Sequence, residues 1–142
     1  TAINLISEYI KVLFPIHPRT KKIIEDNNIE ISSTVLMVDP IGYKEFIGLV
    51  ANSKFIMSDS GGLQEEAGIL NVPCLILREN TEWEYLVTLE KNILVGTDPE
   101  KIFKAAKNLL IDEKKLIEMK NIKSPVEKGS SKKIVDVLIN IQ

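Results

Sequence analysis

The residues best suited to chemistry in this sequence are a serine and two glycines, Ser60, Gly61 and Gly62, between an apolar run and a segment with helical spacing. Two glycines at a strand-to-helix turn let the backbone come close to a ligand, and the first N–H groups of the helix then face that ligand with the positive end of the helix dipole. The Ser60 hydroxyl adds a hydrogen-bonding group. The pattern predicts a phosphate-binding turn, although an ordinary helix start with Ser60 as its N-cap uses the same residues.

An acidic residue lies one turn further into this predicted helix. The Glu66 carboxylate can accept hydrogen bonds from sugar hydroxyls, as acidic residues do for ribose in nucleotide-binding domains. The segment has neither the GxGxxG pattern of dinucleotide-binding turns nor the GxxxxGKS or GxxxxGKT pattern of P-loops. It therefore predicts a nucleotide or sugar-phosphate site of another kind.

Two other candidate binding residues follow apolar runs. His17 lies beside Arg19 at a helix start, where it could donate to an anion or simply shape a surface loop. Arg78 could face an anion or form an ion pair with Glu79 or Glu82. Both alternatives stay open for each residue.

The remaining distinctive residues favour structural roles. Trp83 is expected to pack rather than to stack on a ligand, Phe46 to lie in the core, and Cys74 to be a small buried hydrophobe. Thr81 is expected to be a helix N-cap, with Glu84 three residues later. The chain has one histidine, one cysteine and no nucleophile elbow, so neither a metal site nor another cofactor is expected.

Five short apolar runs rich in branched side chains are predicted to be strands buried on both faces, which is typical of a parallel sheet. Because segments with helical spacing alternate with them, the sequence predicts an α/β fold with a doubly wound, Rossmann-like parallel sheet. Ligands of such sheets bind beyond the carboxyl ends of the strands, where the candidate residues lie. The predicted strands are residues 12–14, 35–38, 55–57, 74–77 and 93–95.

Helices are predicted between and after the strands. Asp98 and Asp112 are expected to cap two of them, and the charged stretch 112–133 is expected to be a solvated helical face with breaks at Ser124-Pro125 and Lys128-Gly129. The predicted helices are 18–27, one with the apolar stripe Tyr43, Phe46, Ile47 and Val50, one with Leu63, Ala67 and Leu70, then 98–110, 112–121 and a last one from Ser130 or Ser131.

The composition limits the class of protein. The chain has 142 residues, 44% of them hydrophobic and 27% charged, so residues 1–142 are expected to form one domain of a soluble, cytoplasmic protein. The apolar runs are too short to cross a bilayer, and a net charge of −2 supplies no general field for nucleic acid. Because it begins at Thr1 and enters helix-like sequence at once, the chain is expected to be a fragment.

The string Asp59-Ser60-Gly61-Gly62-Leu63-Gln64-Glu65-Glu66-Ala67 closely resembles a motif of the UDP-N-acetylglucosamine 2-epimerase family. The resemblance covers roughly residues 11–110. Members of that family resemble two Rossmann-like domains with the active site in the cleft between them, the GT-B architecture, and this chain resembles most of the second, C-terminal domain. Further matches are Pro73-Cys74-Leu75-Ile76-Leu77-Arg78, Thr81-Glu82, Leu94-Val95-Gly96-Thr97, Pro15-Ile16-His17, Pro40, Tyr43 and Phe46.

The resemblance implies that the UDP half of a UDP-sugar lies on this chain. It places Ser60, Gly61 and Gly62 at the diphosphate. It places Glu66 at the ribose hydroxyls and Phe46, through its backbone, at the uracil. The residue types and their spacing alone predict a phosphate-binding glycine pair and a sugar-binding Glu66 as well.

Other positions match the family only in part. His17 matches a histidine of a second, regulatory UDP-sugar pocket in some bacterial members, and Arg78 matches an arginine whose role stays open. Trp83 stands where many members have a ligand-contacting arginine, and Ile41 where some have glutamine. The first domain, with the carboxylates thought to move protons at C2 of the sugar, and a histidine-bearing T-x-H-R-x-E-N type motif have no counterpart in the chain.

The chain is therefore expected to be part of an isomerase and to carry no catalytic residue itself. The resemblance implies the UDP-binding part of a non-hydrolysing epimerase that interconverts UDP-N-acetylglucosamine and UDP-N-acetylmannosamine by eliminating and re-adding UDP. The chain alone is expected to be inactive and to need the missing N-terminal domain, in an enzyme that could be a homodimer. The alternatives are a standalone regulatory module that binds nucleotide-sugars, or part of a hydrolysing epimerase or a GT-B glycosyltransferase.

Overall fold

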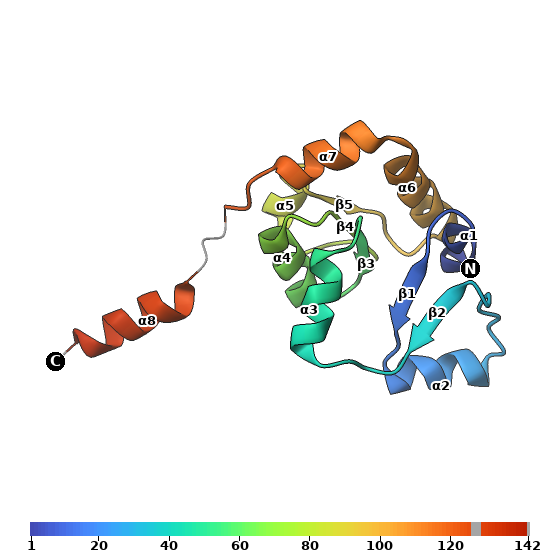
Figure 1. Ribbon diagram of the computed structural model, residues 1–142, viewed down its shortest axis with the longest axis horizontal. Coiled ribbons are helices and arrows are strands. Elements are labelled where there is room, and N and C mark those ends of the chain that lie inside the picture. Colours follow the sequence, from blue (N-terminus) through green and yellow to red (C-terminus); the bar gives the residue numbers. More distant parts are fainter. Residues whose placement is uncertain (126–128, 142) are drawn as a thin grey trace.

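The chain folds into parallel strands that alternate with helices (Figure 1). The computed structural model describes residues 1–125 and 129–141. Its strands are β1 (Val12–Pro15), β2 (Val35–Val38), β3 (Ile56–Ser58), β4 (Cys74–Ile76) and β5 (Asn92–Leu94). Its helices are α1 (Ala2–Ser7), α2 (Pro18–Asp26), α3 (Tyr43–Ala51), α4 (Gly61–Leu70), α5 (Glu84–Thr88), α6 (Pro99–Ile111), α7 (Glu113–Asn121) and α8 (Ser130–Ile139).

The five strands pair as two sheets. The α/β class and the parallel direction are confirmed, and strand bounds differ from the sequence prediction by at most one residue. Within the described residues, however, β1 pairs with β2 and β3, β4 and β5 form a separate sheet, instead of one continuous sheet (Figure 1). Side chains connect the two sheets, because Val12 and Val35 belong to the same buried cluster as Leu75 and Val95. Apolar burial is non-directional and so needs no backbone ladder between β1 and β3.

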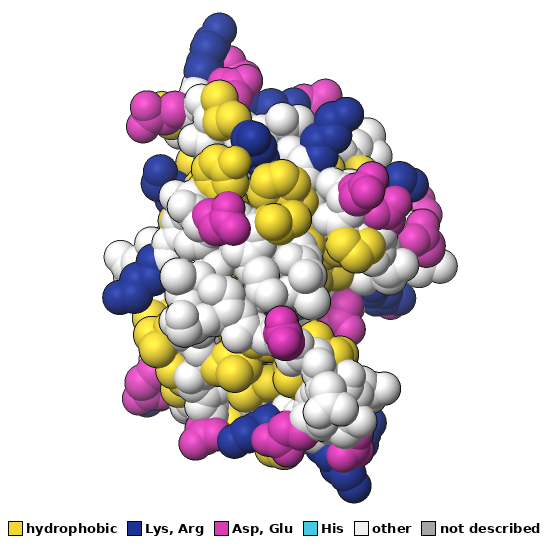
Figure 2. Space-filling model, turned by 90° about the vertical axis from the view of Figure 1, so that its right-hand side faces the viewer, with side chains coloured by type: hydrophobic (Ala, Val, Ile, Leu, Met, Phe, Trp, Pro, Cys, Tyr) yellow, Lys and Arg dark blue, Asp and Glu magenta, His cyan; other side chains and the backbone are white. Residues whose placement is uncertain are grey.

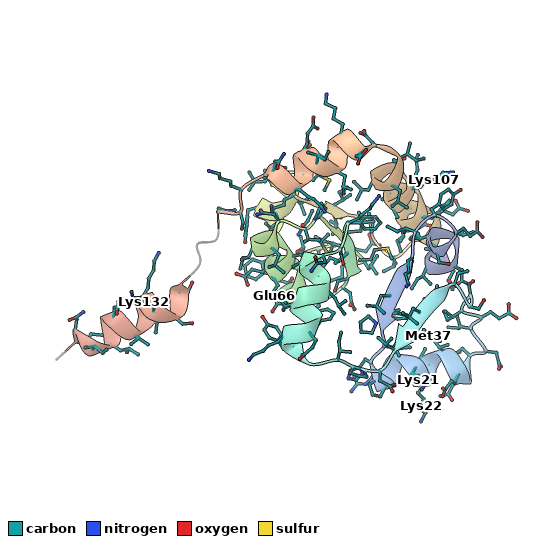
Figure 3. All side chains as sticks on the ribbon, in the orientation of Figure 1. Lys21, Lys22, Met37, Glu66, Lys107 and Lys132 are labelled. Atoms are coloured by element: carbon teal, nitrogen blue, oxygen red, sulfur yellow. The ribbon has the colours of Figure 1, made fainter. Side chains whose placement is uncertain are left out.

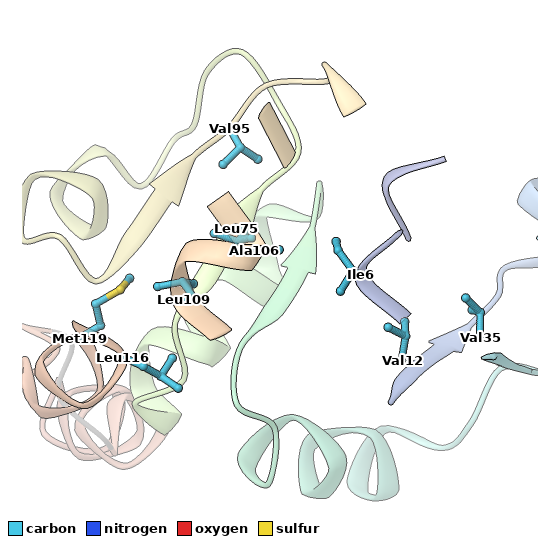
Figure 4. Packing of buried hydrophobic residues seen from close by; sticks show 9 residues of the cluster. All are labelled: Ile6, Val12, Val35, Leu75, Val95, Ala106, Leu109, Leu116 and Met119. Atoms are coloured by element: carbon cyan, nitrogen blue, oxygen red, sulfur yellow. The ribbon is translucent and has the colours of Figure 1, made fainter. Parts of the chain in front are cut away.

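This shared cluster is the main core of the chain. It gathers side chains from both sheets and from helices α1, α6 and α7 (Figure 4). Residues of α6 and α7 cover one side of the β3–β5 sheet, and α1 packs against α6. The nine buried members are Ile6, Val12, Val35, Leu75, Val95, Ala106, Leu109, Leu116 and Met119.

A second, smaller cluster lies between the β3–β5 sheet and helices α3 and α4. Its buried members include Val50 of α3, Ala67 of α4 and Cys74 of β4, with Phe46 and Leu63 packed against them. The two helices that carry most candidate site residues are therefore fixed to the sheet and to each other by apolar contacts.

Four of the predicted helix starts are confirmed. Pro18 is the first residue of α2, and Ser60, Asp98 and Asp112 are the N-caps of α4, α6 and α7, each accepting a hydrogen bond from a backbone N–H of the following turn. The prediction that Thr81 is an N-cap is wrong. Helix α5 begins two residues later, after Trp83, because the Thr81 hydroxyl instead accepts from the Trp83 N–H within the preceding loop.

A buried lysine connects the ends of two helices. The Lys91 ammonium is fully buried and donates to Asn71 Oδ1 (2.9 Å) and to the Ile122 carbonyl (2.5 Å). Asn71 and Ile122 are the C-caps of α4 and α7, where a cation also interacts favourably with the helix dipoles. Burial lowers the pKa of Lys91. Lys91 thus holds α7 against the end of α4 that lies opposite the glycine turn.

Helix α8 stands apart from the other elements (Figure 1). Its start at Ser130 confirms the prediction of a last helix, and Ser124 and Pro125 lie in the break after α7, whereas Lys128 lies outside the described residues. None of the residues of α8 is buried, although several are large and apolar. The core is therefore built without α8.

The surface carries charges of both signs. Basic and acidic side chains are interspersed over the face shown in Figure 2, between patches of hydrophobic side chains. An anion would therefore be attracted by a local arrangement of donors rather than by the field of a whole face. Over residues 1–125 and 129–141, no helix combines the length and apolar character required to cross a membrane.

The core assignment predicts the cost of removing one side chain. Leu75 is fully buried in the central strand of the β3–β5 sheet, so Leu75→Ala should lower the free energy of unfolding by about 2–5 kcal/mol. The matched control Leu138→Ala, in α8 and 64% exposed, should change it by less than about 0.5 kcal/mol. Urea denaturation followed by circular dichroism measures both, and equal losses would contradict this core.

Candidate functional site

The serine and glycine turn lies at the carboxyl end of β3, where α4 begins. Ser60 is extended, and its hydroxyl accepts from the Leu63 N–H at 3.5 Å, which confirms it as the N-cap. The Ser58 hydroxyl in turn accepts from the Ser60 N–H at 3.0 Å. The turn is therefore held from both sides, and both interpretations of Ser60, as a cap and as part of a binding turn, are compatible with this geometry.

The glycine amides at this turn are available to a ligand. None of the described residues accepts a hydrogen bond from the N–H of Gly61 or Gly62. Ser60 and Gly62 are exposed, and a Cβ added at Gly62 would meet no atom within 4 Å. The start of α4 therefore presents free donors and the positive end of the helix dipole to open space.

The loop before α5 braces the turn from the other side. The indole N–H of Trp83 donates to the Gly61 carbonyl at 2.8 Å, and the Thr81 hydroxyl donates to Gln64 Oε1 at 2.5 Å. Gln64 is fully buried, and none of the described residues forms a hydrogen bond with its Nε2. Trp83 thus packs as expected and also fixes the carbonyl of the first residue of α4.

Two roles were open for Arg78, contact with an anion and an ion pair with Glu79 or Glu82. The structure shows that Arg78 forms the ion pair with Glu82. Its Nη1 lies 3.1 Å from both carboxylate oxygens of Glu82. The pKa of Glu82 lies below its ordinary value because its carboxylate accepts from its own backbone N–H and from Arg78. A Cβ added at Gly61 would come within 3.4 Å of Glu82, so the pair lies beside the turn.

Glu66 lies on α4 next to α3 (Figure 3). Its Oε1 accepts a hydrogen bond from the hydroxyl of Tyr43, the first residue of α3, at 2.9 Å. Phe46, three residues after Tyr43, is half-buried and packs against the small core cluster instead of entering it fully. Glu66, which is predicted to bind the ribose, and Phe46, which is predicted to lie at the uracil, are therefore on two helices that contact each other.

His17 has a structural role in this structure. It is the N-cap of α2, and its Nδ1 accepts from the Arg19 N–H at 3.2 Å. It lies between β1 and α2, whereas the other candidate residues lie on α3, at the start of α4, on α4 and in the loop after β4. Within the described residues no hydrogen bond links His17 to the turn at Ser60.

Cys74 is excluded from chemistry by its surroundings. It is fully buried in β4, and burial raises the pKa of its thiol to about 12. The thiol is therefore neutral at physiological pH, as expected for a buried hydrophobe.

Sequence reasoning missed three polar contacts around the turn. They involve the Tyr43 hydroxyl, the Gln64 amide and the Trp83 indole N–H. Tyr43 is predicted to lie in an apolar stripe and matches a family position, but neither pattern indicates the hydrogen-bond partner of its hydroxyl. Gln64 had one signal, since it falls on the same face as the apolar Leu63 and Ala67 and so had to be buried.

Comparison with known proteins decides the family. Residues 1–139 match the model of the family described as UDP-N-acetylglucosamine 2-epimerase. The chain belongs to the UDP-N-acetylglucosamine 2-epimerase family. The match extends beyond residues 11–110, over which the resemblance was expected.

Relatives in this family are similar over nearly the whole chain. A UDP-N-acetylglucosamine 2-epimerase of Methanococcus maripaludis is 45% identical over 141 residues, 95% of this chain and 37% of its own length. The corresponding protein of Methanocaldococcus jannaschii is 41% identical over 132 residues, 89% of this chain and 34% of its own length. The chain thus spans about a third of the length of these epimerases and corresponds to a C-terminal part of them.

Solved epimerase structures have the same fold. The crystal structure of the Methanocaldococcus jannaschii epimerase in complex with UDP-N-acetylglucosamine and UDP superimposes with a TM-score of 0.79 at 40% identity, covering 95% of this chain and 37% of that chain. A Neisseria meningitidis epimerase bound to UDP-N-acetylglucosamine gives a TM-score of 0.76 at 30% identity, covering 97% of this chain and 40% of that chain. These neighbours are GT-B-type enzymes, which confirms the predicted architecture.

The brace at the turn predicts the effect of removing the Trp83 donor. Trp83→Phe keeps an aromatic ring but loses the N–H that donates to the Gly61 carbonyl. We expect the free energy of unfolding to fall by about 1–3 kcal/mol and the first amides of α4 to exchange faster with solvent deuterium. Urea denaturation and hydrogen exchange measure the two effects.

A neighbouring ring supplies the matched control. Tyr85 lies edge-on to Trp83 with ring centroids 6.0 Å apart, and its buried hydroxyl forms no hydrogen bond within residues 1–125 and 129–141. Tyr85→Phe should therefore leave stability unchanged or raise it, and should not speed exchange at the start of α4. Equal exchange in the Trp83→Phe protein and the wild type would show that the indole does not brace the turn.

Proposed function

We propose that this chain is the UDP-binding part of a UDP-N-acetylglucosamine 2-epimerase. The observation that carries the proposal is the open turn at Gly61 and Gly62, with unpaired amides at the start of α4 and an acidic residue one turn further along. Membership in the family and the UDP and UDP-sugar complexes of related epimerases support the choice of ligand.

In this proposal the ligand lies along the start of α4 and the neighbouring start of α3. The amides of Gly61 and Gly62 and the hydroxyl of Ser60 bind the diphosphate, which the helix dipole stabilises. Glu66 accepts from the ribose hydroxyls, and the backbone of Phe46 contacts the uracil. Of the residues that would make these contacts, Ser60 and Gly62 are exposed, Gly61 and Glu66 are half-buried, and Phe46 packs against the small core cluster between α3 and α4.

The chemistry assigned to the chain is stabilisation of the leaving group. The reaction we propose for the whole enzyme eliminates UDP and adds it back with the configuration at C2 of the sugar inverted. Amides aimed at the departing diphosphate stabilise the charge that develops on it. No residue of this chain is assigned to proton transfer at C2, so we expect the chain to bind UDP without turning over UDP-N-acetylglucosamine, and the remaining two-thirds of the enzyme to supply the acids and bases.

Two other candidate residues receive different assignments. Arg78 is proposed as a second contact for the anion, since its ion pair with Glu82 lies beside Gly61 and uses only Nη1 among the contacts of the described residues, which leaves other N–H donors of the guanidinium for an anion. His17 is proposed only as a residue of a second UDP-sugar pocket, since its Nε2 stays available while Nδ1 caps α2.

The proposal also includes the oligomeric state and the cellular location of the whole enzyme. The whole enzyme is proposed to be a homodimer that works in the cytoplasm on a free UDP-sugar. A single cysteine, fully buried, is compatible with a reducing compartment.

Two glycine variants test the proposed diphosphate site. Gly62 and Gly48 are both exposed helical glycines at which an added Cβ would meet no atom within 4 Å, so either alanine variant should fold at least as well as the wild type. Only Gly62→Ala places a methyl group in the space assigned to the diphosphate, and we expect it to weaken UDP binding about tenfold or more. Isothermal titration calorimetry with UDP measures the dissociation constants.

Side-chain variants complete this test. Ser60→Ala and Glu66→Ala should both weaken UDP binding, and Gly48→Ala should leave it unchanged. A wild-type chain that binds no UDP, or equal affinities for the Gly62→Ala and Gly48→Ala proteins, would contradict the proposed function. Turnover of UDP-N-acetylglucosamine by the chain alone would contradict the assignment of proton transfer to the rest of the enzyme.

A further inference from the structure

One hydrogen bond connects the two helices that form the proposed nucleotide site. The hydroxyl of Tyr43 donates to Oε1 of Glu66 at 2.9 Å, across 23 residues of sequence. Tyr43 is 66% exposed, so burial does not force this contact. Within residues 1–125 and 129–141, this is the hydrogen bond that the structure gives the Glu66 carboxylate.

The packing beneath the bond brings its two partners together. Phe46 and Val50 lie about one and two turns after Tyr43 on the same side of α3, and both belong to the small core cluster. Leu63 and Ala67, the neighbours of Glu66 on α4, belong to that cluster as well. The core thus fixes the distance between α3 and α4, and Tyr43 spans it at the solvent edge.

We propose that Tyr43 is a positioning residue for the nucleotide, which holds the Glu66 carboxylate where it accepts from the two cis-hydroxyls of a ribose. This inference rests on the proposed function and adds a determinant of specificity for ribose over deoxyribose. Glu66 is only half-buried, so without the tyrosine its side-chain bonds could rotate and its oxygens would have no fixed direction.

The chemistry of the pair fits this role. An ionised carboxylate offers about four acceptor positions on its two oxygens, of which Tyr43 occupies one, so positions remain for two adjacent hydroxyls. The hydrogen bond to Glu66 and partial desolvation raise the pKa of Tyr43 above its ordinary value. The hydroxyl therefore keeps its proton at neutral pH and acts only as a donor toward Glu66.

Two nucleotides that differ only in the ribose hydroxyls test this inference. Calorimetry with UDP and with 2′,3′-dideoxyuridine diphosphate compares the wild-type chain with the Tyr43→Phe variant. We expect Tyr43→Phe to weaken UDP binding about three- to tenfold and to leave binding of the dideoxy nucleotide unchanged. If the role of Tyr43 were purely structural, Tyr43→Phe would weaken the binding of both nucleotides by the same factor.

Two further variants serve as controls. Tyr9→Phe changes another exposed tyrosine, which packs against Phe103 instead of a carboxylate, and should leave both affinities unchanged. In a Glu66→Gln background, Tyr43→Phe should have a smaller effect on UDP than in the wild type, because the two residues act through one contact.

The outcomes separate this inference from the proposed function. A wild-type chain that does not bind UDP overturns both. A wild-type chain that binds UDP more tightly than the dideoxy nucleotide, together with a Tyr43→Phe variant that has unchanged UDP affinity, overturns the positioning role alone. The positioning role is also overturned if Tyr43→Phe lowers the affinity for both nucleotides equally. It is overturned as well if the variant binds UDP more tightly, because Tyr43 would then have competed with the ribose for Glu66.

Discussion

The proposed nucleotide site depends on one constraint: the first amides of α4, just after the end of β3, must stay free to bind an anion. A helix start leaves its first N–H groups without internal partners, and here the glycines keep side chains away from them. The surrounding contacts fix the turn without occupying those amides, since Ser60 caps with its hydroxyl and Trp83 bonds the Gly61 carbonyl. Donors that are held in place and unpaired can bind an anion with little reorganisation.

The core places this turn beside α3. Strands β3 and β4 run parallel, so the turn after β3 and the loop after β4 meet at one edge of the sheet. The cluster that contains Val50 and Ala67, with Phe46 packed against it, sets α3 beside α4, and Lys91 holds the far end of α4 to α7. The nucleotide site we propose is thus assembled from two helices whose relative position is set by buried side chains away from the ligand.

Local patterns predicted most of the elements, and long-range contacts account for what they missed. Apolar runs predicted the five strands, and residues typical of helix starts predicted where α2, α4, α6, α7 and α8 begin, because these signals lie within a few residues. The separation of β1 and β3 into two sheets depends on contacts between distant segments and leaves no local signal. The Tyr43–Glu66 hydrogen bond and the burial of Lys91 also depend on contacts between distant segments. In the sequence, these polar residues look like ordinary surface positions.

The availability of the Gly61 and Gly62 amides to a diphosphate can be measured directly by ¹⁵N–¹H correlation spectroscopy of the chain. The account predicts that adding UDP shifts the amide signals of Gly61 and Gly62 most strongly, and that uridine, which lacks phosphate, leaves them nearly in place. If UDP binds and shifts other amides while the signals of Gly61 and Gly62 do not move, the turn at the start of α4 is not the diphosphate site.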